Sequence, residues 1–284
     1  MSETAANPDN YCYRHPDRQS FILCQRCGRT VCAECRVMAP VGVHCPECMT
    51  EARESAPRVA PAALTAVRRL TRADAPIVTY SIIALCVLVF IAEVLTGVLG
   101  AGDLGVVFWG LAFLPPYAVA EPWRMITSIF VHMTVLHILF NLYSLFILGP
   151  ELEKLLGRAR YVTLFLLAGL GGSVAVLFLA PDTVVSGASG AIFGLFGAYF
   201  VIVRHLGGGS RQMLIVIAIN VVIGFIVPNI AWEAHIGGLI VGAGVAYLFV
   251  RTRERRLRNR QIALVAAVAV VLVVLTFVGV SLIS

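Results

Sequence analysis

The feature that most constrains this chain is a series of apolar runs close to the length that crosses a bilayer. The hydrocarbon core of a membrane is about 30 Å thick, so a helix needs about 20 apolar residues to span it. The chain has 284 residues, of which 59% are apolar and only 13% charged, far from the composition of soluble domains. These runs predict an all-α polytopic membrane protein with seven spans, near 76–100, 125–150, 161–180, 183–203, 213–230, 234–250 and 262–284.

The distribution of basic residues predicts the orientation. If the apolar stretch 104–119 does not cross, the N-terminus shares one side of the membrane with 151–160, 204–212 and 251–260, and the last of these segments carries six arginines. Because short cytoplasmic loops retain Lys and Arg, we expect a cytoplasmic N-terminus, an external C-terminus and a location in the plasma (inner) membrane. Residues 104–119 are then re-entrant or interfacial. Topology also explains the net charge of +6, so no nucleic-acid partner is predicted.

Before the first span, seven of the eight cysteines form pairs with two intervening residues, and one histidine completes the set. Such pairs turn two soft ligands toward one tetrahedral Zn²⁺, and four pairs supply two closed structural sites. A disulfide framework is the competing interpretation, but the inferred cytoplasmic side is reducing. We expect structural zinc, bound by Cys12, His15, Cys24, Cys27, Cys32, Cys35, Cys45 and Cys48.

The expected zinc is structural in both sites, because each closed set of four ligands leaves no open position for a catalytic water. The run from Cys12 to Cys48 resembles a B-box-type zinc finger, in which ligand pairs interleave. That resemblance implies two ions, and the alternatives of a single occupied site or of His44 in place of Cys45 stay open. It assigns one ion to Cys12, His15, Cys32 and Cys35, and the other to Cys24, Cys27, Cys45 and Cys48.

The module is small enough that metal binding is expected to drive its folding. We therefore divide the chain into a cytoplasmic zinc-finger module at 1–50, which would recruit a cytoplasmic protein partner, and a linker at 51–75 that is rich in Ala, Arg and Pro.

Polar side chains inside spans are costly and point to function or to a packed interior. Ser189 follows Gly187 at the external start of the fourth span, and His235 enters the sixth span from the same side. Glycines on both spans form small-residue faces that let two helix backbones approach closely. An imidazole can then reach a hydroxyl, which is the arrangement of an activated serine nucleophile.

His137 and Asn141 are four residues apart on the second span, so they share one helical face in its outer half. Both side chains can donate hydrogen bonds to an oxyanion. No carboxylate is placed beside His235, since Glu233 lies on another face of its helix and Glu93 lies near the outer end of the first span. The sequence therefore favours a Ser-His dyad over a triad.

In this order and at these spacings, the motifs resemble those of the rhomboid intramembrane proteases. The motifs that carry the resemblance are Glu121-Pro122-Trp123-Arg124, His132-x4-His137-x3-Asn141, Gly149 to Gly157 with Glu153, Gly187-Ala188-Ser189-Gly190 and Ala234-His235-x-Gly237-Gly238. The resemblance implies a six-helix catalytic core at 76–250. It also implies an Arg-rich cytoplasmic linker at 251–260 and an accessory seventh helix at 261–284.

By the same resemblance, Ser189 attacks the scissile carbonyl and His235 takes its proton. His137, Asn141 and the Ser189 backbone N–H would form the oxyanion hole. His132 would support a polar network, and Trp123 and Arg124 would fix the external loop. Phe193 departs from the family, which often has tyrosine there, so the ring can stack on His235 without offering a hydroxyl.

The predicted function is an intramembrane serine endopeptidase that cleaves transmembrane segments of membrane proteins near the outer leaflet. No cofactor is needed for that catalysis. Two other hypotheses are weighed against it. A catalytically weak rhomboid-like scaffold would bind transmembrane clients and recruit cytoplasmic partners through its zinc finger, but both members of the dyad are present. A proton-relaying transporter or channel would need polar groups through the inner leaflet, and the spans carry too few.

Overall fold

The computed structural model describes residues 8–39, 42–55, 75–99, 105–209, 211–227 and 230–283. The chain divides into two compact units, 1–67 and 68–284. Most of the expected linker at 51–75 lies outside the described residues.

The N-terminal unit consists of short elements around cysteines. Its two antiparallel pairs are β1 with β2, where Cys12 pairs with His15, and β3 with β4. The buried residues of this unit are mainly the cysteines and Val31, so little apolar core is available to hold it together. The helix α1 extends five residues beyond the expected end of the module at residue 50. The elements are η1 Pro8–Asn10, β1 Tyr11–Cys12, β2 His15–Gln19, β3 Val37–Met38, β4 Val43–His44 and α1 Pro46–Ser55.

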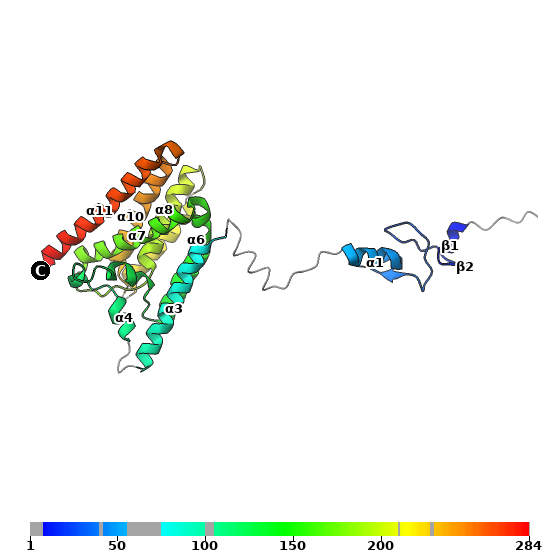
Figure 1. The fold of residues 1–284 in the computed structure, drawn as a ribbon, viewed down its shortest axis with the longest axis horizontal. Coiled ribbons are helices and arrows are strands. Elements are labelled where there is room, and N and C mark those ends of the chain that lie inside the picture. The colour runs from blue at the N-terminus through cyan, green and yellow to red at the C-terminus, as the bar shows by residue number, and fades with distance from the viewer. Residues whose placement is uncertain are drawn as a thin grey trace, which may run out of the picture. The chain divides into compact units, whose positions relative to one another are not determined.

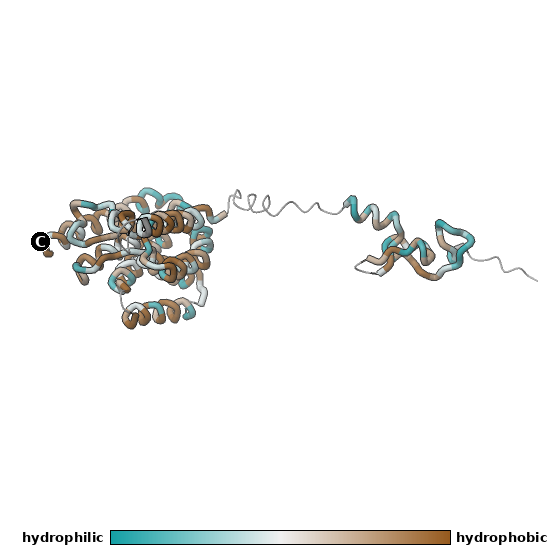
Figure 2. Tube along the Cα trace, turned by 90° about the horizontal axis from the view of Figure 1, so that it is seen from below, coloured by the Kyte–Doolittle hydropathy of each residue, from teal (hydrophilic) through white to brown (hydrophobic). Residues whose placement is uncertain are grey.

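The second unit is a bundle of helices whose surface is largely apolar (Figures 1 and 2). Helices satisfy their own backbone hydrogen bonds, which is the requirement that lipid imposes on a spanning segment. The helices are α3 Ile77–Leu99, α4 Val106–Leu111, α5 Arg124–Thr127, α6 Val135–Leu156, α7 Arg158–Leu179, α8 Ser189–His205, α9 Arg211–Ile226, α10 Trp232–Arg251 and α11 Arg258–Ile283, with 3₁₀ turns η2 Pro115–Tyr117, η3 Ser128–Phe130 and η4 Arg255–Leu257.

Five of the described helices are long and apolar enough to cross a membrane, namely α3, α6, α7, α10 and α11. The protein is therefore a multi-pass, all-α membrane protein. Helices α8 and α9 are apolar but shorter, with 17 and 16 residues. The remaining two of the seven expected spans fall on these shorter helices.

Two expected span boundaries differ from the structure. The second span begins at Val135 rather than near 125, because residues 124–130 form α5 and η3 instead. The fourth begins at Ser189 rather than at 183, and 183–188 are not helical. Apolar composition alone cannot separate a helix from a buried non-helical segment that precedes it. Within the described residues 105–119, the helical elements are the six-residue α4 and the turn η2, both too short to span a membrane.

Close contacts at glycines pack the central helices of the bundle together. A methyl group added at Gly197 of α8 would lie 2.7 Å from the backbone oxygen of Leu239 in α10. One added at Gly172 of α7 would lie 2.8 Å from the backbone oxygen of Ala234. Helix α10 is thus held against α7 and α8 at backbone contact distance, which only small residues permit.

A buried carboxylate caps the first membrane helix. Glu153 of α6 is 3% exposed and accepts hydrogen bonds from the backbone N–H groups of Val78 and Thr79, at 3.0 and 2.8 Å, and from the Thr79 hydroxyl at 2.8 Å. Free N–H groups at a helix N-terminus favour an anionic acceptor. These bonds tie the start of α3 to the end of α6.

Candidate active site

Ser189 is the first residue of α8 and is partly exposed. The chain reaches it through Gly187, whose φ of +104° is a conformation that glycine adopts most readily. The Gly187 N–H donates to the backbone oxygen of Ser128 at 2.8 Å, and Val185 forms a bridge with Phe113. The segment before the serine is therefore anchored to the 105–130 region.

Helices α8 and α10 contact each other directly below this point. A methyl group at Gly190 would lie 3.2 Å from the backbone oxygen of Ala234, and one at Gly194 would lie 2.9 Å from that of Gly238. Ser189 and His235 are the sequence neighbours of Gly190 and Ala234, the two residues of the first of these contacts. The small-residue faces expected from the sequence are those that pack together.

His235 is buried at 7% exposure, and its ring is stacked on Phe193. The ring centroids are 4.1 Å apart and the planes differ by 8°. Because Phe193 lies one turn after Ser189, the two share a face of α8. The stack therefore holds the imidazole on the face that carries the serine. The stacking expected for Phe193 is present.

The Nδ1 atom of His235 is buried and has no hydrogen-bond partner in the described part of the chain. It faces α9, since a methyl group added at Gly224 would lie 3.3 Å from it. No carboxylate among the described residues lies within 4 Å of the ring. Nor do these residues contain a hydrogen bond between the Ser189 hydroxyl and His235.

His137 and Asn141 lie beside Gly187. A methyl group there would overlap His137 Nε2, lie 2.7 Å from its Cε1 and lie 3.6 Å from Asn141 Nδ2. Asn141 is buried and donates to the His137 backbone oxygen at 3.0 Å, and the side chain of Thr134 caps the helix by accepting from His137 N–H at 3.1 Å. Two side-chain donors thus adjoin the turn that leads into Ser189.

His132 lies in the segment before α6 and not within a helix, which corrects its expected place in the second span. It is 1% exposed, and its ring lies against that of His137 with centroids 5.1 Å apart. Its backbone N–H donates to both carboxylate oxygens of Glu93, at 3.3 and 3.2 Å. No local sequence pattern indicates the pairing of Glu93 with His132, since 39 residues separate them.

Arg124 connects two parts of the 105–130 region. Its guanidinium pairs with Glu121 and donates to the backbone oxygens of Trp109 and Ala112, the latter at 3.0 Å. Those carbonyls belong to the end of α4, so Arg124 holds that helix to the following turn. Trp123 is 52% exposed and takes no part in these bonds.

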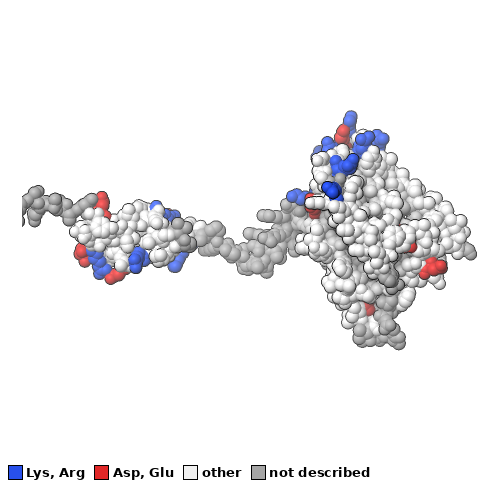
Figure 3. Space-filling model, turned by 180° about the vertical axis from the view of Figure 1, so that it is seen from behind, with Lys and Arg blue, Asp and Glu red and all other residues white. Residues whose placement is uncertain are grey.

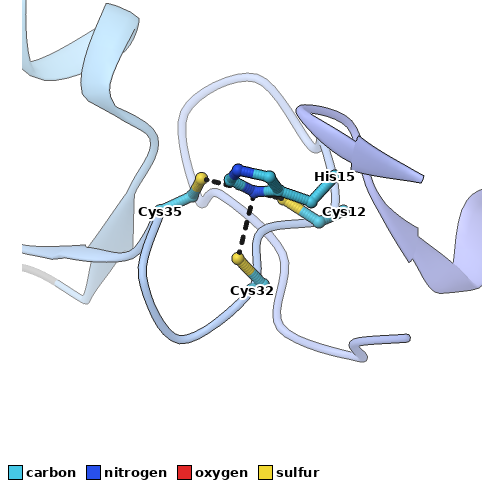
Figure 4. Close-up of side chains that lie close together, drawn as sticks. All are labelled: Cys12, His15, Cys32 and Cys35. Atoms are coloured by element: carbon cyan, nitrogen blue, oxygen red, sulfur yellow. Dashed lines mark hydrogen bonds between the residues drawn. The ribbon is translucent and has the colours of Figure 1, made fainter. Parts of the chain in front are cut away.

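The N-terminal unit holds two further candidate sites, both for metal ions. In each, four ligand atoms lie within 4.8 Å of one another, so both clusters can bind a metal ion. The second cluster includes Cys45 and not His44. The clusters are Cys12, His15, Cys32 and Cys35 (Figure 4), and Cys24, Cys27, Cys45 and Cys48.

The spacing within these clusters suits a tetrahedral ion. With Zn–S near 2.3 Å and Zn–N near 2.0 Å, tetrahedral ligands lie about 3.5 to 3.8 Å apart. The His15 Nδ1 atom lies 3.8 Å from Cys12 Sγ, 3.5 Å from Cys32 Sγ and 3.4 Å from Cys35 Sγ. In the second cluster, Cys27 Sγ and Cys45 Sγ are 3.7 Å apart. Nδ1 is therefore the histidine atom turned toward the sulfurs.

Hydrogen bonds from backbone N–H groups lower the pKa of three of these thiols, Cys12, Cys24 and Cys32. Burial raises the pKa of Cys24, but N–H groups of Cys27, Cys45 and Arg26 outweigh it and lower that pKa to about 6. For Cys12 the pKa is lowered to about 7, because N–H groups of Cys32, Arg14 and His15 likewise outweigh burial. The thiolate is the form that binds a metal.

The fold and these side chains define a class of protein: a multi-pass, all-α membrane protein in which two closely packed helices, α8 and α10, carry Ser189 and His235 near their N-terminal ends. Comparison with known proteins identifies the family. The rhomboid domain model matches residues 119–252, and the N-terminal unit lies outside that range.

Among the relatives, "Putative rhomboid protease YdcA" of Bacillus subtilis is 40% identical over 145 residues, which are 49% of this chain and 73% of that protein. Rhomboid protease GlpG of Salmonella newport is 34% identical over 187 residues, 63% of this chain and 65% of the relative. Rhomboid protease GluP of Bacillus subtilis is 35% identical over 176 residues, 59% of this chain but only 34% of that protein. The chain belongs to the rhomboid family of serine intramembrane endopeptidases, as its motifs suggested.

Proposed function

We propose that this protein cleaves transmembrane segments of other membrane proteins with a dyad of Ser189 and His235. The observation that carries the proposal is the stack of His235 on Phe193, one turn below Ser189 on the same face of α8. The glycine contacts between α8 and α10 support it, because they bring the two backbones close enough for the side chains to meet.

In the proposed reaction, Ser189 Oγ bonds to the scissile carbonyl carbon while its proton passes to His235. Since Nδ1 faces α9, the atom that accepts the proton is Nε2. The imidazolium then protonates the leaving amine as the C–N bond breaks, which leaves an acyl-enzyme. A water deprotonated by His235 hydrolyses the ester and restores the serine hydroxyl. With no carboxylate beside the ring, the Phe193 stack is what orients it.

The negative charge that develops on the carbonyl oxygen must be stabilised by hydrogen-bond donors. The Ser189 N–H lies in the first turn of α8, where it has no partner within the helix. Gly187 N–H is already bound to Ser128, so it does not serve. We assign the remaining donors to the side chains of His137 and Asn141, which adjoin Gly187. His132, whose backbone N–H is bound to Glu93, would position His137 through the contact between the two rings.

The substrates we propose are single-span proteins whose helices unwind readily near the outer leaflet, because the scissile segment must be extended at the serine. The basic loops support an orientation with the N-terminus in the cytoplasm and the C-terminus outside the plasma membrane. Arg124 and Trp123 would keep the 105–130 region in place at the outer boundary.

We further propose that the two clusters of the N-terminal unit bind one structural Zn²⁺ each and that the folded module recruits a cytoplasmic protein. The ligand spacings support zinc, and the thin apolar core supports a structural role. The proposed division is a module at 1–50, a linker at 51–75, a core at 76–250, an Arg-rich linker at 251–260 and a seventh helix at 261–284.

The test is cleavage of a single-span substrate by purified protein in lipid nanodiscs. Ser189→Ala and His235→Ala should each abolish cleavage, whereas Ser186→Ala, three residues away in the same segment, should retain it. Each variant must match the wild type in thermal unfolding. Cleavage by Ser189→Ala at the wild-type rate would exclude the dyad. A folded wild type that binds the substrate without cleaving it would favour the client-binding scaffold instead.

A further inference from the structure

A hollow far from the proposed dyad opens where α8 and α10 end and α11 begins. It has a volume of about 560 Å³, and a neighbouring one of about 180 Å³ shares His205, Val250 and Arg253 with it. Ser189 and His205 are the two ends of α8, so at 1.5 Å per residue the hollow lies about 24 Å from the serine. It belongs to the opposite end of the bundle from the proposed catalytic residues.

The lining of this hollow is strongly basic. Arg251, Arg253 and Arg260 contribute to the larger hollow, and no carboxylate within the described ranges lies within 4 Å of their guanidinium groups. The single acidic residue of the lining, Glu254, is paired with Arg256. Figure 3 shows Lys and Arg gathered at this end of the helical unit. The hollow therefore presents several positive charges that have no negative partner.

Hydrogen bonds beside the hollow join the segments that carry these arginines. Gln261 is 6% exposed and donates to the backbone oxygen and hydroxyl of Thr252, at 3.2 and 2.7 Å. Its Oε1 atom accepts from Arg160 Nε at 2.9 Å. These bonds join the turn after α10 to the start of α11 and to α7. A general excess of arginine in cytoplasmic loops requires no such arrangement.

The remaining wall of the hollow is largely apolar. Tyr247, Leu248, Val250 and Leu264 contribute to it, and the Tyr247 side chain is 54% exposed beneath the Arg251 guanidinium, 5.8 Å from the ring centroid. Tyrosine and arginine at a helix end are typical of the membrane interface. A ligand here would meet positive charge on one side and hydrocarbon on the other.

We propose that this hollow binds the phosphodiester headgroup of an anionic membrane lipid, with the phosphate against Arg253 and Arg260 and the acyl chains along Tyr247 and Leu264. Charge complementarity selects a phosphate, and the apolar wall selects a lipid over a free phosphate compound. Bound there, the lipid would connect the end of α10 to α11. The proposal does not depend on the dyad or on the proteolytic reaction.

The test is titration of the purified protein with cardiolipin, followed by native mass spectrometry, with phosphatidylcholine as the uncharged comparison. Arg253→Gln with Arg260→Gln should weaken cardiolipin binding about tenfold or more. The matched control, Arg255→Gln with Arg258→Gln, removes the same charge from the same segment outside the hollow, and it should change binding less than about threefold. Equal losses in the two double variants would overturn the proposal, and so would equal binding of phosphatidylcholine.

Two further measurements complete the test. The first distinguishes a lipid from a free phosphate compound, and the second uses the wild type, so it does not depend on the folding of the variants. Inorganic pyrophosphate at millimolar concentration should not displace cardiolipin, and full displacement would overturn the assignment to a lipid. A photoreactive cardiolipin added to the wild type should label residues within 247–264. Labelling confined to other helices would also overturn it, whatever the stability of the double variant.

Discussion

The contact between α8 and α10 gives a sharp test of how the site is built. A methyl group added at Gly238 would lie 2.6 Å from the carbonyl carbon of Gly190 and closer still to its oxygen. Carbon atoms pack at about 3.5 to 4.0 Å, so Gly238→Ala forces the helices apart by roughly 1 Å. That displacement separates the backbones that carry Ser189 and His235.

A misplacement of about 1 Å at a catalytic site lowers the rate by about a hundredfold. We therefore expect Gly238→Ala to reduce the cleavage rate in nanodiscs by that factor. The matched control is Gly244→Ala on the same helix, where a methyl group has no neighbour within 4 Å. Because alanine favours a helix over glycine by about 1 kcal/mol, the control should keep its activity and unfold at the same or a higher temperature. Full activity in Gly238→Ala, or an equal loss in Gly244→Ala, would refute this reasoning.

The remaining predictions concern the metal clusters and the buried carboxylate. Replacing Cys24 and Cys27 by serine should lower the zinc content from two ions per chain to one, measured by elemental mass spectrometry, because the other cluster keeps its ligands. A content that stays at two would contradict the interleaved pairing. Glu93→Leu leaves the buried His132 N–H without an acceptor, so it should cost about 2 kcal/mol of stability in thermal unfolding, while Glu93→Gln retains an oxygen and should cost less. Equal losses in both variants would argue against the hydrogen bond as the cause.

Hydropathy and motif spacing predicted the helical class and the family, because lipid leaves the backbone few alternatives. They predicted the boundaries less well. The start of α8 at Ser189 depends on the bridge between Val185 and Phe113, a contact between segments 72 residues apart that no local pattern encodes. The same holds for the place of His132, which lies outside the helix it was expected to join.

Side-chain partners across the bundle were predicted only in part. The stack of Phe193 on His235 was expected from the resemblance to the rhomboid proteases. The packing of α3 pairs Glu93 with His132, and the packing of α9 places Gly224 beside His235 Nδ1. Neither contact could be predicted from the spacing of residues. The hollow at the arginine-rich end also had no local signal. The arginines were visible in the sequence, but the sequence did not indicate that several of them line one hollow.

The central claim is that the hydroxyl of Ser189 is activated by the imidazole of His235. Its most direct measurement is labelling with a fluorophosphonate probe, with the modified residue identified by peptide mass spectrometry. We expect the wild type to be labelled at Ser189 and His235→Ala, folded to the same extent, to be labelled far more slowly. A label on another serine, or equal labelling rates in the wild type and His235→Ala, would contradict it.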